Sequence, residues 1–578
     1  MRLRDARLVT TLEQKPISNQ ARVGYDAHTL SRRRLKMAFV VFAAIYGVIA
    51  IRLTYLASQG APTQPSRQLH ASSSRPDIVD RNGYLLATDL RVASLYAEPR
   101  RILDVDEAIE GLQNILPELD FAQTYAKLKS DLAFVWLKRQ LAFEQQRAIT
   151  ALGIPAIGFR EETQRYYPNG REFSHVIGLT NIDNQGISGL EKWIDGQGLT
   201  DLNIAGLGRS VDFKPIKLSL DARVQHVLHD ELSLALARYK AAAAGGVILN
   251  AKSGEIVALV SLPDFDPNNP HDAFAEDKLN RISASTAEMG STIKTFTTAM
   301  AMEIGKASLS TMFDASQPIV VGRQRVHDPH SKGRPLSLEE VFLFSSNIGS
   351  AQEARLVGVE QHQAFLTRLG LLTRLDTELP EIAHPVQPRR WSQATSITGA
   401  FGHGFATTPL QTAVGIAAIL NHGRLIPPTF LPRTEAEASR LATIVVGERT
   451  SQAMRYLYRL NGVKGSGRRA NIPGFRVGGK TGTAEKVIDG RYAKDRNFNA
   501  FVAALPMDDP QMVILVVIDD PKPEKVGQGN TSAANAAPTA GAIIRRAALM
   551  LGLRPEPDLE EAIVVGDFKR DFVVLGDE

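Results

Sequence analysis

A serine and a lysine three positions apart are the first candidates for chemistry. Ser291 and Lys294 lie in the segment EMGSTIKTFTTAMAME, where apolar side chains recur at helical spacing after Gly290. Residues three apart share one face of a helix, so the lysine amine can reach the serine hydroxyl, and unpaired N–H groups at a helix start can hold an oxyanion. A buried lysine with a lowered pKa can act as general base for a serine nucleophile. About one chance match to this pattern is expected in a chain this long, so it needs support from other segments.

A second polar segment, Ser345-Ser346-Asn347, follows the apolar run VFLF and precedes IGSAQEA. A hydroxyl and a carboxamide two residues apart can relay a proton and hold a substrate amide. Read alone, however, these residues are better explained as the cap of a helix.

A third polar segment, Lys480-Thr481-Gly482-Thr483, lies in RVGGKTGTAEKVI. A cation and two hydroxyls on a strand edge suit the docking of a peptide with a free carboxylate. Residues 474–481 also fit the letters of a phosphate-binding loop, but such a loop needs an apolar strand before it and a helix after it. Because a strand-like AEKVI follows, we do not expect a nucleotide site here.

The composition excludes several classes of site. The chain of 578 residues has no cysteine, which excludes disulfides, Cys-ligated zinc, iron–sulfur clusters and thiol nucleophiles. His226 and His229 have helical spacing, but they match no zinc-protease order and fall on an amphipathic segment, where a solvated or core-edge role is expected. The segment Lys252-Ser253-Gly254 reads as a hairpin turn, and no Gly-x-Ser-x-Gly elbow is present. Neither cysteine nor histidine therefore organises a site in this sequence.

The net charge of +5 is concentrated at the N-terminus. Residues 1–36 carry nine Lys and Arg against three acidic residues, which leaves about −1 for the rest of the chain. No nucleic-acid partner is expected for a body so nearly neutral. Residues 37–57 then form a largely apolar stretch of 21 residues, which as a helix is long enough to cross a bilayer core of about 30 Å.

The order of these segments predicts a topology. The cluster RRRLK at 32–36 directly precedes the apolar stretch, so the positive-inside rule keeps residues 1–36 in the cytoplasm as a basic tail and exports the remainder. A cleaved signal peptide ending near Ala57 or Ala61 is one alternative, although its basic region would be 36 residues long. A buried core helix is another, which the polar residues at both ends disfavour. The interpretation is a single-pass membrane protein with a large extracytoplasmic body.

The body is expected to hold two folded modules. A Pro- and Ser-containing linker at 58–74 leads to an α+β module at 75–215, and a larger unit at 216–555 precedes a C-terminal tail at 556–578. The first module begins with a hairpin whose turn, Asn82-Gly83, supplies positive φ angles.

Periodicity predicts the elements of both modules. In the first, residues 104–150 show helical periodicity. The larger unit reads as a strand and amphipathic helix from 216, a hairpin at 246–262, helices over 285–460, strands at 498–505 and 512–519, and a closing helix at 531–553. An antiparallel sheet with helices before, within and after it predicts an α/β (α+β) catalytic unit.

Taken together and in this order, the three polar segments resemble the motifs of the penicilloyl-serine transferases, which are the penicillin-binding proteins and serine β-lactamases. Flanking segments are similar to class B penicillin-binding proteins over nearly the whole chain beyond the apolar stretch: Arg75–Gly83, Gly186–Glu191, Leu218–Asp221, Gly246–Ile248, Ser253–Ile256, Asn280-Arg281, Thr408–Gln411 and Gly479–Ala484. Ser-Ser-Asn and Lys-Thr-Gly-Thr-Ala resemble the division-specific, septal type more than the elongation type. Two departures are Met289, where the family usually has proline, and Pro76, where it usually has glycine.

The resemblance implies a mechanism for the catalytic residues. Ser291 would attack the D-Ala-D-Ala bond of a donor stem peptide while Lys294 takes its proton. Backbone N–H groups of Ser291 and Thr483 would form the oxyanion hole. Ser345 would relay a proton to the departing D-alanine, and Asn347 would steady the acyl chain.

The resemblance also implies the binding partners. Lys480, Thr481, Gly482 and Thr483 would bind the terminal carboxylate, and an amine of a neighbouring peptidoglycan stem peptide would take the acyl group without metal or ATP. β-Lactams would acylate the serine, and a membrane glycan polymerase and other division proteins would be partners in the bacterial inner membrane. Alternatives are a D,D-carboxypeptidase or β-lactamase of the same fold, and a non-catalytic division scaffold or β-lactam sensor.

Overall fold

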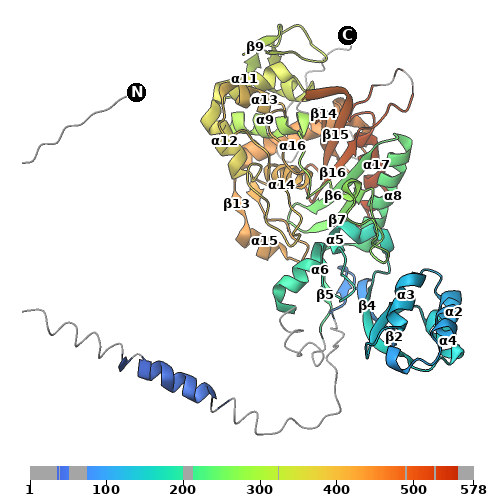
Figure 1. The fold of residues 1–578 in the computed structure, drawn as a ribbon. Coiled ribbons are helices and arrows are strands. Elements are labelled where there is room, and N and C mark those ends of the chain that lie inside the picture. Colours follow the sequence, from blue (N-terminus) through green and yellow to red (C-terminus); the bar gives the residue numbers. More distant parts are fainter. Residues whose placement is uncertain are drawn as a thin grey trace, which may run out of the picture. The chain divides into compact units, whose positions relative to one another are not determined.

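The computed structural model forms two units, residues 1–70 and 71–578 (Figure 1). The residues that it describes are 36–37, 39–50, 52, 75–199, 213–322, 324–488, 491–525, 527 and 529–556. Nearly all of the expected basic tail, the linker at 58–74 and nearly all of the C-terminal tail therefore lie outside the described residues.

Within the first unit, residues 39–50 are helical, and their apolar side chains are exposed, as for Phe39 at 79%. Residues 38, 51 and 53–57 of the expected membrane span are not described. Across the described residues, no helix combines the length and the apolar character needed to cross a membrane.

The first module of the second unit is an α+β fold. Its sheet and helices are β1 (Ile78–Val79), β2 (Leu85–Ala97), β3 (Val135–Leu141), β4 (Ile157–Tyr166), α2 (Val105–Ile115), α3 (Phe121–Leu128), α4 (Phe143–Leu152), α5 (Ser174–Ile177) and α6 (Gly189–Ile194). β2 pairs antiparallel with β1, β3 and β4. Leu95, Leu112 and Leu128 are buried in the core between this sheet and the helices.

Two sequence-based expectations in this module are wrong in detail. Strand β3 interrupts the helical periodicity over 104–150. Its Val135, Leu137 and Leu141 are buried, and the two-residue spacing between Val135 and Leu137 is that of a strand. In the β1–β2 hairpin only Gly83 of the Asn82-Gly83 pair has a positive φ, of 87°. Asp80 supplies the rest of the turn, because its Oδ1 accepts from the backbone N–H groups of Asn82 and Tyr84 at 2.7 and 2.8 Å.

The larger unit is built on a five-stranded antiparallel sheet in the order β14-β15-β16-β6-β7. Its strands are β6 (Ala243–Asn250), β7 (Ile256–Leu262), β14 (Gly478–Ile488), β15 (Arg491–Leu505) and β16 (Met512–Asp519). Side chains alternate between two cores: Leu515 and Val517 lie in one, and Val516 and Ile518 in the other. This arrangement confirms the expected antiparallel sheet, with β14 at its edge.

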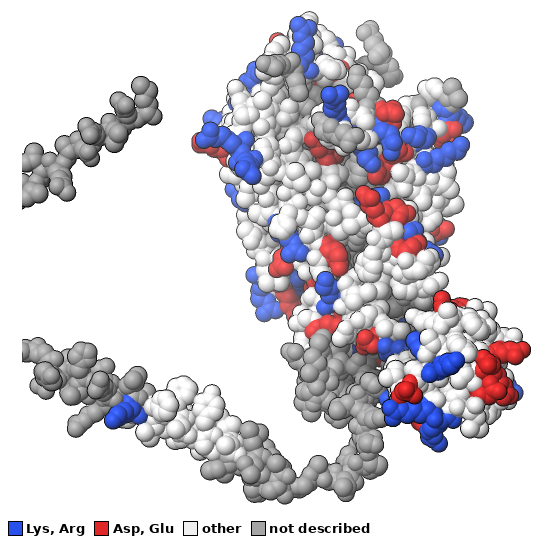
Figure 2. All heavy atoms as spheres, viewed as in Figure 1, with Lys and Arg blue, Asp and Glu red and all other residues white. Residues whose placement is uncertain are grey.

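Helices cover both faces of this sheet (Figure 1). α8 (Ala222–Arg238) and α17 (Ala536–Ala547) pack on one face, and α14 (Pro409–Leu420), α16 (Glu448–Lys464) and α9 (Lys294–Glu303) lie on the other side. The remaining helices and strands are β5 (Ile216–Lys217), β8 (Met312–Phe313), β9 (Ile319–Val321), β10 (Gln324–Val326), β11 (Leu336–Ser337), α10 (Leu338–Leu343), α11 (Asn347–Val357), α12 (Val359–Arg368), α13 (Gln393–Gly399), β12 (Arg424–Leu425), α15 (Glu435–Leu441) and β13 (Thr443–Ile444). Positive and negative side chains are interspersed over the visible face of the body (Figure 2).

The two modules join through paired strands. β1 lies parallel to β5, with Ile78 opposite Ile216. Beside this pairing, the Arg81 guanidinium donates to the Ser219 carbonyl at 2.8 Å and to Glu255 at 2.9 Å. The first strand of one module is therefore hydrogen-bonded to the first strand of the next.

A buried ion cluster stabilises the first module. Glu191, whose side chain is 0% exposed, accepts from Arg75 Nε at 2.9 Å and from Arg165 Nε at 2.6 Å. Both arginine side chains are 1% exposed. The neighbouring Glu191 and Asp89 carboxylates raise the pKa of Arg165 despite its burial.

Glu191→Gln is expected to lower the free energy of unfolding by about 3–5 kcal/mol, because it leaves two buried guanidinium groups without their shared carboxylate. Glu118→Gln is the matched control, since Glu118 pairs with Lys138 at the surface with a side chain 43% exposed and should change the stability by about 1 kcal/mol or less. Urea unfolding of both variants measures the difference. Equal stabilities would show that the cluster is not a stabilising feature.

Candidate active site

Ser291 lies in a 3-10 turn, η5 (Gly290–Ile293), which continues directly into α9. The expected helix start therefore exists, but its first turn is tighter than an α-helix. Apolar Ile293, Phe296 and Met300 are buried and fix this segment in the core. The burial of its neighbours leaves Ser291 at the surface of a cleft.

Close backbone contacts hold this turn against β14. A Cβ on Gly290, whose φ is 52°, would lie 2.8 Å from the Thr483 carbonyl oxygen, and one on Gly482 would lie 2.4 Å from the Met289 carbonyl oxygen. On the other side, a Cβ on Gly402 would lie 2.0 Å from the Gly290 carbonyl oxygen. Only glycine fits at these three positions without a shift of the backbone. The turn is thus held between the strand and the 401–404 loop.

The Ser-Ser-Asn segment connects α10 to α11. Ser345 has a φ of 56°, a left-handed backbone conformation that is uncommon for a residue with a side chain. Ser346 is the N-cap of α11, because its hydroxyl accepts from the Gly349 N–H at 2.9 Å. The cap interpretation is therefore confirmed for Ser346, while Ser345 and Asn347 line the cleft.

Asp328 fixes this segment, although no sequence pattern indicates that role for it. Its Oδ2 accepts from the Ser346 hydroxyl at 2.6 Å, and its Oδ1 accepts from the backbone N–H groups of Asn347 and Ile348 at 2.6 and 3.0 Å. A carboxylate at the start of α11 also interacts favourably with the helix dipole.

The three polar segments meet at one hydroxyl. The Lys294 amine donates to Ser345 Oγ at 3.2 Å, to Asn347 Oδ1 at 2.7 Å and to the Ser345 carbonyl. From the edge strand β14, the Lys480 amine donates to the same Ser345 Oγ at 2.9 Å. Ser291 lines the same cleft, and its hydroxyl has no hydrogen-bond partner among the described residues. The structure thus brings together residues separated by almost two hundred positions.

Burial lowers the pKa of both lysines. Desolvation holds the pKa of Lys294 well below its usual range, and the neighbouring Lys480 charge lowers it further. Desolvation also lowers the pKa of Lys480 to about 7. The ammonium groups of Lys294 and Lys480 both lie within reach of one hydroxyl and repel each other. As the pH rises, one of them loses its proton first, and the site then holds one neutral amine.

The cleft has a volume of about 940 Å³. Thr481 and Thr483 line it from β14; the Thr481 hydroxyl hydrogen-bonds Ser466 Oγ at 2.7 Å, and Thr483 Oγ1 accepts from the Ser532 N–H at 3.1 Å. Since Lys480 and Gly482 belong to a strand, residues 474–481 do not have the strand–loop–helix form of a phosphate-binding loop.

The other candidate residues lie outside the cleft. His226 pairs with Glu172 and His229 with Asp264, at 2.7 and 2.8 Å. Lys252-Ser253-Gly254 forms the turn between β6 and β7, as expected. In the part of the chain that the structure describes, no group of three or more His, Asp or Glu residues has the arrangement of a metal site.

Sequence reasoning missed a second polar group in the wall of the cleft. His403 Nδ1 lies 2.9 Å from Glu288 Oε2, while Glu288 Oε1 accepts from the Gly404 N–H at 2.8 Å and from the Tyr492 hydroxyl at 3.2 Å. These residues come from three separate loops and strands, so no local pattern could reveal them.

Two family descriptions match the chain. "Penicillin binding protein transpeptidase domain" matches residues 244–545, and "Penicillin-binding Protein dimerisation domain" matches residues 70–196.

Curated relatives resemble the chain over most of its length. It is 37% identical to the probable peptidoglycan D,D-transpeptidase FtsI of Caulobacter vibrioides over 84% of this chain and 83% of the relative. It is 30% identical to the probable peptidoglycan D,D-transpeptidase PenA of Neisseria meningitidis, over 95% of this chain and 96% of the relative. It is also 30% identical to the peptidoglycan D,D-transpeptidase FtsI of Escherichia coli K12, over 92% of this chain and 94% of the relative.

Proposed function

The chain belongs to the class B penicillin-binding proteins, which are peptidoglycan D,D-transpeptidases, and we propose that it works by acyl transfer through Ser291. The observation that carries this proposal is the meeting of the Lys294 and Lys480 amines at Ser345 Oγ, in the cleft that Ser291 lines. Nucleophilic catalysis by a serine needs a base near its hydroxyl, and the buried Lys294 amine, three residues along the same helical segment, is the candidate.

In the acylation step, the neutral Lys294 amine takes the Ser291 proton as the hydroxyl oxygen attacks the D-Ala-D-Ala carbonyl carbon. The lowered pKa of Lys294 supports this role, because only an unprotonated amine is a base. The backbone N–H groups of Ser291 and Thr483 hold the oxyanion, and the glycine contacts between η5 and β14 support their closeness. Ser345 passes the proton to the leaving D-alanine amine, since its hydroxyl contacts both lysine amines.

The donor peptide lies along the edge strand β14. Lys480, Thr481 and Thr483 bind its terminal carboxylate, with Gly482 allowing the strand to approach η5. Asn347, held by Lys294, steadies the acyl chain. β-Lactams mimic this peptide and acylate the same serine.

The acceptor of the acyl group decides between cross-linking and hydrolysis. We expect lipid-linked glycan strands, incubated with this protein and a glycan polymerase, to yield cross-linked peptide dimers detected by mass spectrometry. Trimmed stem peptides without dimers would instead identify a D,D-carboxypeptidase, and multiple-turnover hydrolysis of penicillin in a separate incubation would identify a β-lactamase.

The cellular role proposed is septal cross-linking from the inner membrane. Residues 37–57 would anchor the chain, with residues 1–36 in the cytoplasm and the catalytic unit outside. The Ser-Ser-Asn and Lys-Thr-Gly-Thr-Ala motifs and the similarity to FtsI proteins support the septal assignment. A glycan polymerase and other division proteins are the proposed partners.

An alkaline phosphatase fused after Glu578 is expected to be active in cells, because the enzyme gains activity only outside the cytoplasm. A fusion after Lys36 is the matched control and should be inactive. The opposite pattern would reverse the proposed topology.

A further inference from the structure

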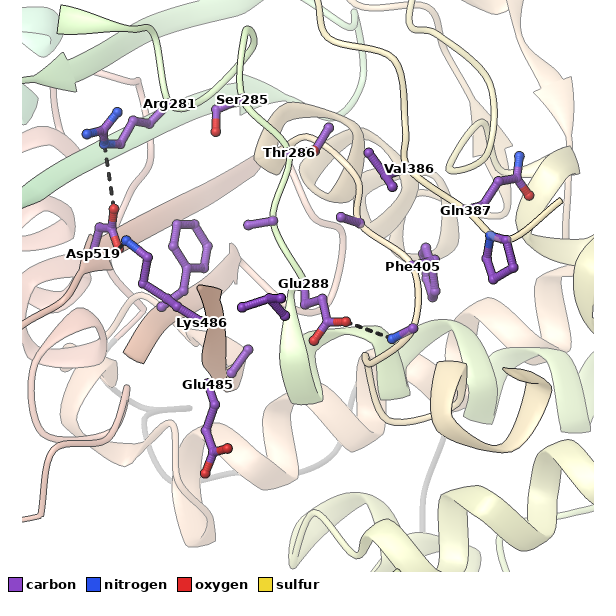
Figure 3. Close-up of a pocket in the computed structure, with 17 residues that line it drawn as sticks. Arg281, Ser285, Thr286, Glu288, Val386, Gln387, Phe405, Glu485, Lys486 and Asp519 are labelled. Carbon is purple, nitrogen blue, oxygen red and sulfur yellow. Dashed lines mark hydrogen bonds and ion pairs between the residues drawn. The ribbon is translucent and has the colours of Figure 1, made fainter. Parts of the chain in front are cut away.

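A second cavity of about 730 Å³ adjoins the catalytic cleft (Figure 3). Gly404 and Glu485 line both spaces. The apolar side chains of Val386 and Phe405 lie on one side of the cavity, and Arg281, Lys486 and Asp519 lie on the opposite side. A site that transfers an acyl group between two peptides needs room for the second one beside the first, and this cavity shares two lining residues with the donor cleft.

The charges of the cavity are separated along it. Asp519 faces two cations, Lys486 at 2.7 Å and Arg281 at 3.7 Å, so this end has an excess of one positive charge. Glu288 and Glu485 lie nearer the cleft, and the exposed Glu485 has no ion-pair partner among the described residues. A zwitterionic ligand therefore fits with its ammonium group toward the cleft and its carboxylate toward Lys486.

His403 lies where the two spaces meet. Its Nδ1 faces Glu288, which orients the ring, and its side chain is 28% exposed. In the neutral ring that donates its Nδ1–H to the carboxylate, Nε2 carries the lone pair, and among the described residues Nε2 has no hydrogen-bond partner. A Cβ on Gly402, the preceding residue, would lie 2.0 Å from the Gly290 carbonyl oxygen, next to Ser291. Burial and the Glu288 charge raise the pKa of Tyr492 to about 12, so this hydroxyl stays protonated and donates to Glu288.

We propose that the 730 Å³ cavity binds the acceptor, an amine that also bears a carboxylate, and that His403, oriented by Glu288, is the base that activates its amine. This inference rests on the proposed acyl transfer through Ser291. It assigns the acceptor side of the reaction to residues that lie outside the three polar segments.

The acceptor enters as an ammonium ion, and His403 Nε2 removes one proton and releases it to the solvent. The amine nitrogen then attacks the ester carbon of the acyl-enzyme, forming the amide C–N bond as the bond to Ser291 Oγ breaks. The second proton lost from nitrogen passes through Lys294 to Ser291 Oγ, which restores the hydroxyl.

The first experiment compares two nucleophiles on the acyl-enzyme formed from a thioester donor at pH 7. In His403→Gln, the rate of transfer to D-alanine, relative to acylation by the donor, is expected to fall about 10²-fold. Transfer to hydroxylamine, which is already neutral at this pH, should fall less than threefold. His422→Gln is the matched control, because His422 also contacts a glutamate, Glu448 at 2.8 Å, but lies outside the cleft.

The outcomes separate this inference from the function on which it rests. Equal losses with both nucleophiles would mean that His403 is structural, and no loss with either would remove it from the reaction; both results overturn the assignment. If the wild-type protein forms no acyl-enzyme at Ser291, the proposed function itself fails.

The second experiment tests the cavity through Lys486→Gln, which removes the excess positive charge. The KM for D-alanine is expected to rise about fivefold, while the KM for D-alaninamide, which lacks the carboxylate, should change less than twofold. Lys522→Gln is the control, since Lys522 pairs with Asp520 at 3.1 Å outside the cavity. Equal shifts for the two acceptors would contradict carboxylate binding at Lys486.

Discussion

Ser291→Ala is expected to abolish covalent labelling by a fluorescent penicillin. The hydroxyl oxygen of Ser291 is the proposed nucleophile and the atom that forms the ester. Without it, the acylation rate should fall by at least about 10⁴-fold. Labelling is measured on purified protein by gel fluorescence after a time course at saturating penicillin. The melting temperature of the variant serves as the test that the fold is intact.

A matched serine variant makes this result specific. Ser310 is an exposed serine outside the cleft, and Ser310→Ala should be labelled at the wild-type rate. Full labelling of Ser291→Ala would discard the nucleophile assignment, and mass spectrometry of the labelled peptide would then show which residue carries the ester.

Lys294→Met is expected to slow acylation by about 10³-fold, because it removes the general base while keeping a long side chain in the buried site. Penicillin acylation measured by stopped-flow or quenched labelling gives the rate. Lys306→Met, at an exposed lysine shortly after α9, is the control and should behave as wild type. A loss of less than tenfold would exclude Lys294 as the base.

The pH dependence of the wild-type rate follows from the same amine. A base must be unprotonated. The acylation rate should therefore rise as the pH increases through the pKa of Lys294, which burial holds below its usual range. Removing the Lys480 charge, as in Lys480→Gln, relieves one cause of that lowering and should move the rising limb to higher pH. In Lys294→Met this rising limb should disappear.

Sequence reasoning reached the centre of the site because its residues stand in short motifs. The positions of Ser291 and Lys294 in one turn, of Ser346 as a helix cap and of Lys480 on an edge strand were all predicted from local patterns, and the structure confirms these placements. The convergence of the three segments around the Ser291 hydroxyl was expected from the family resemblance and could not be worked out from spacing; in the structure the two lysine amines meet at Ser345 Oγ, in the cleft that Ser291 lines.

The residues that were missed are those whose partners are distant in the chain. Asp328 caps α11 from a loop nineteen residues before Asn347, and Glu288 contacts His403 across 115 positions. Strand β3 was missed for a different reason, since a run such as VWLKRQL has apolar residues that fit both a helix and a strand. Tertiary contacts decide such cases, and a single sequence does not contain them.

The pairing of β1 with β5 has a mechanical consequence. A chain truncated to begin at residue 216 would leave β5 without its neighbour and would remove the Arg81 guanidinium from Glu255. A force that pulls on the N-terminal side of the first module would therefore be transmitted to the catalytic unit through the hydrogen bonds between β1 and β5, which it would load in shear, and not through a flexible linker. Such a force would thus act on β5, next to the start of α8, which packs on strands β6 and β7 of the catalytic sheet.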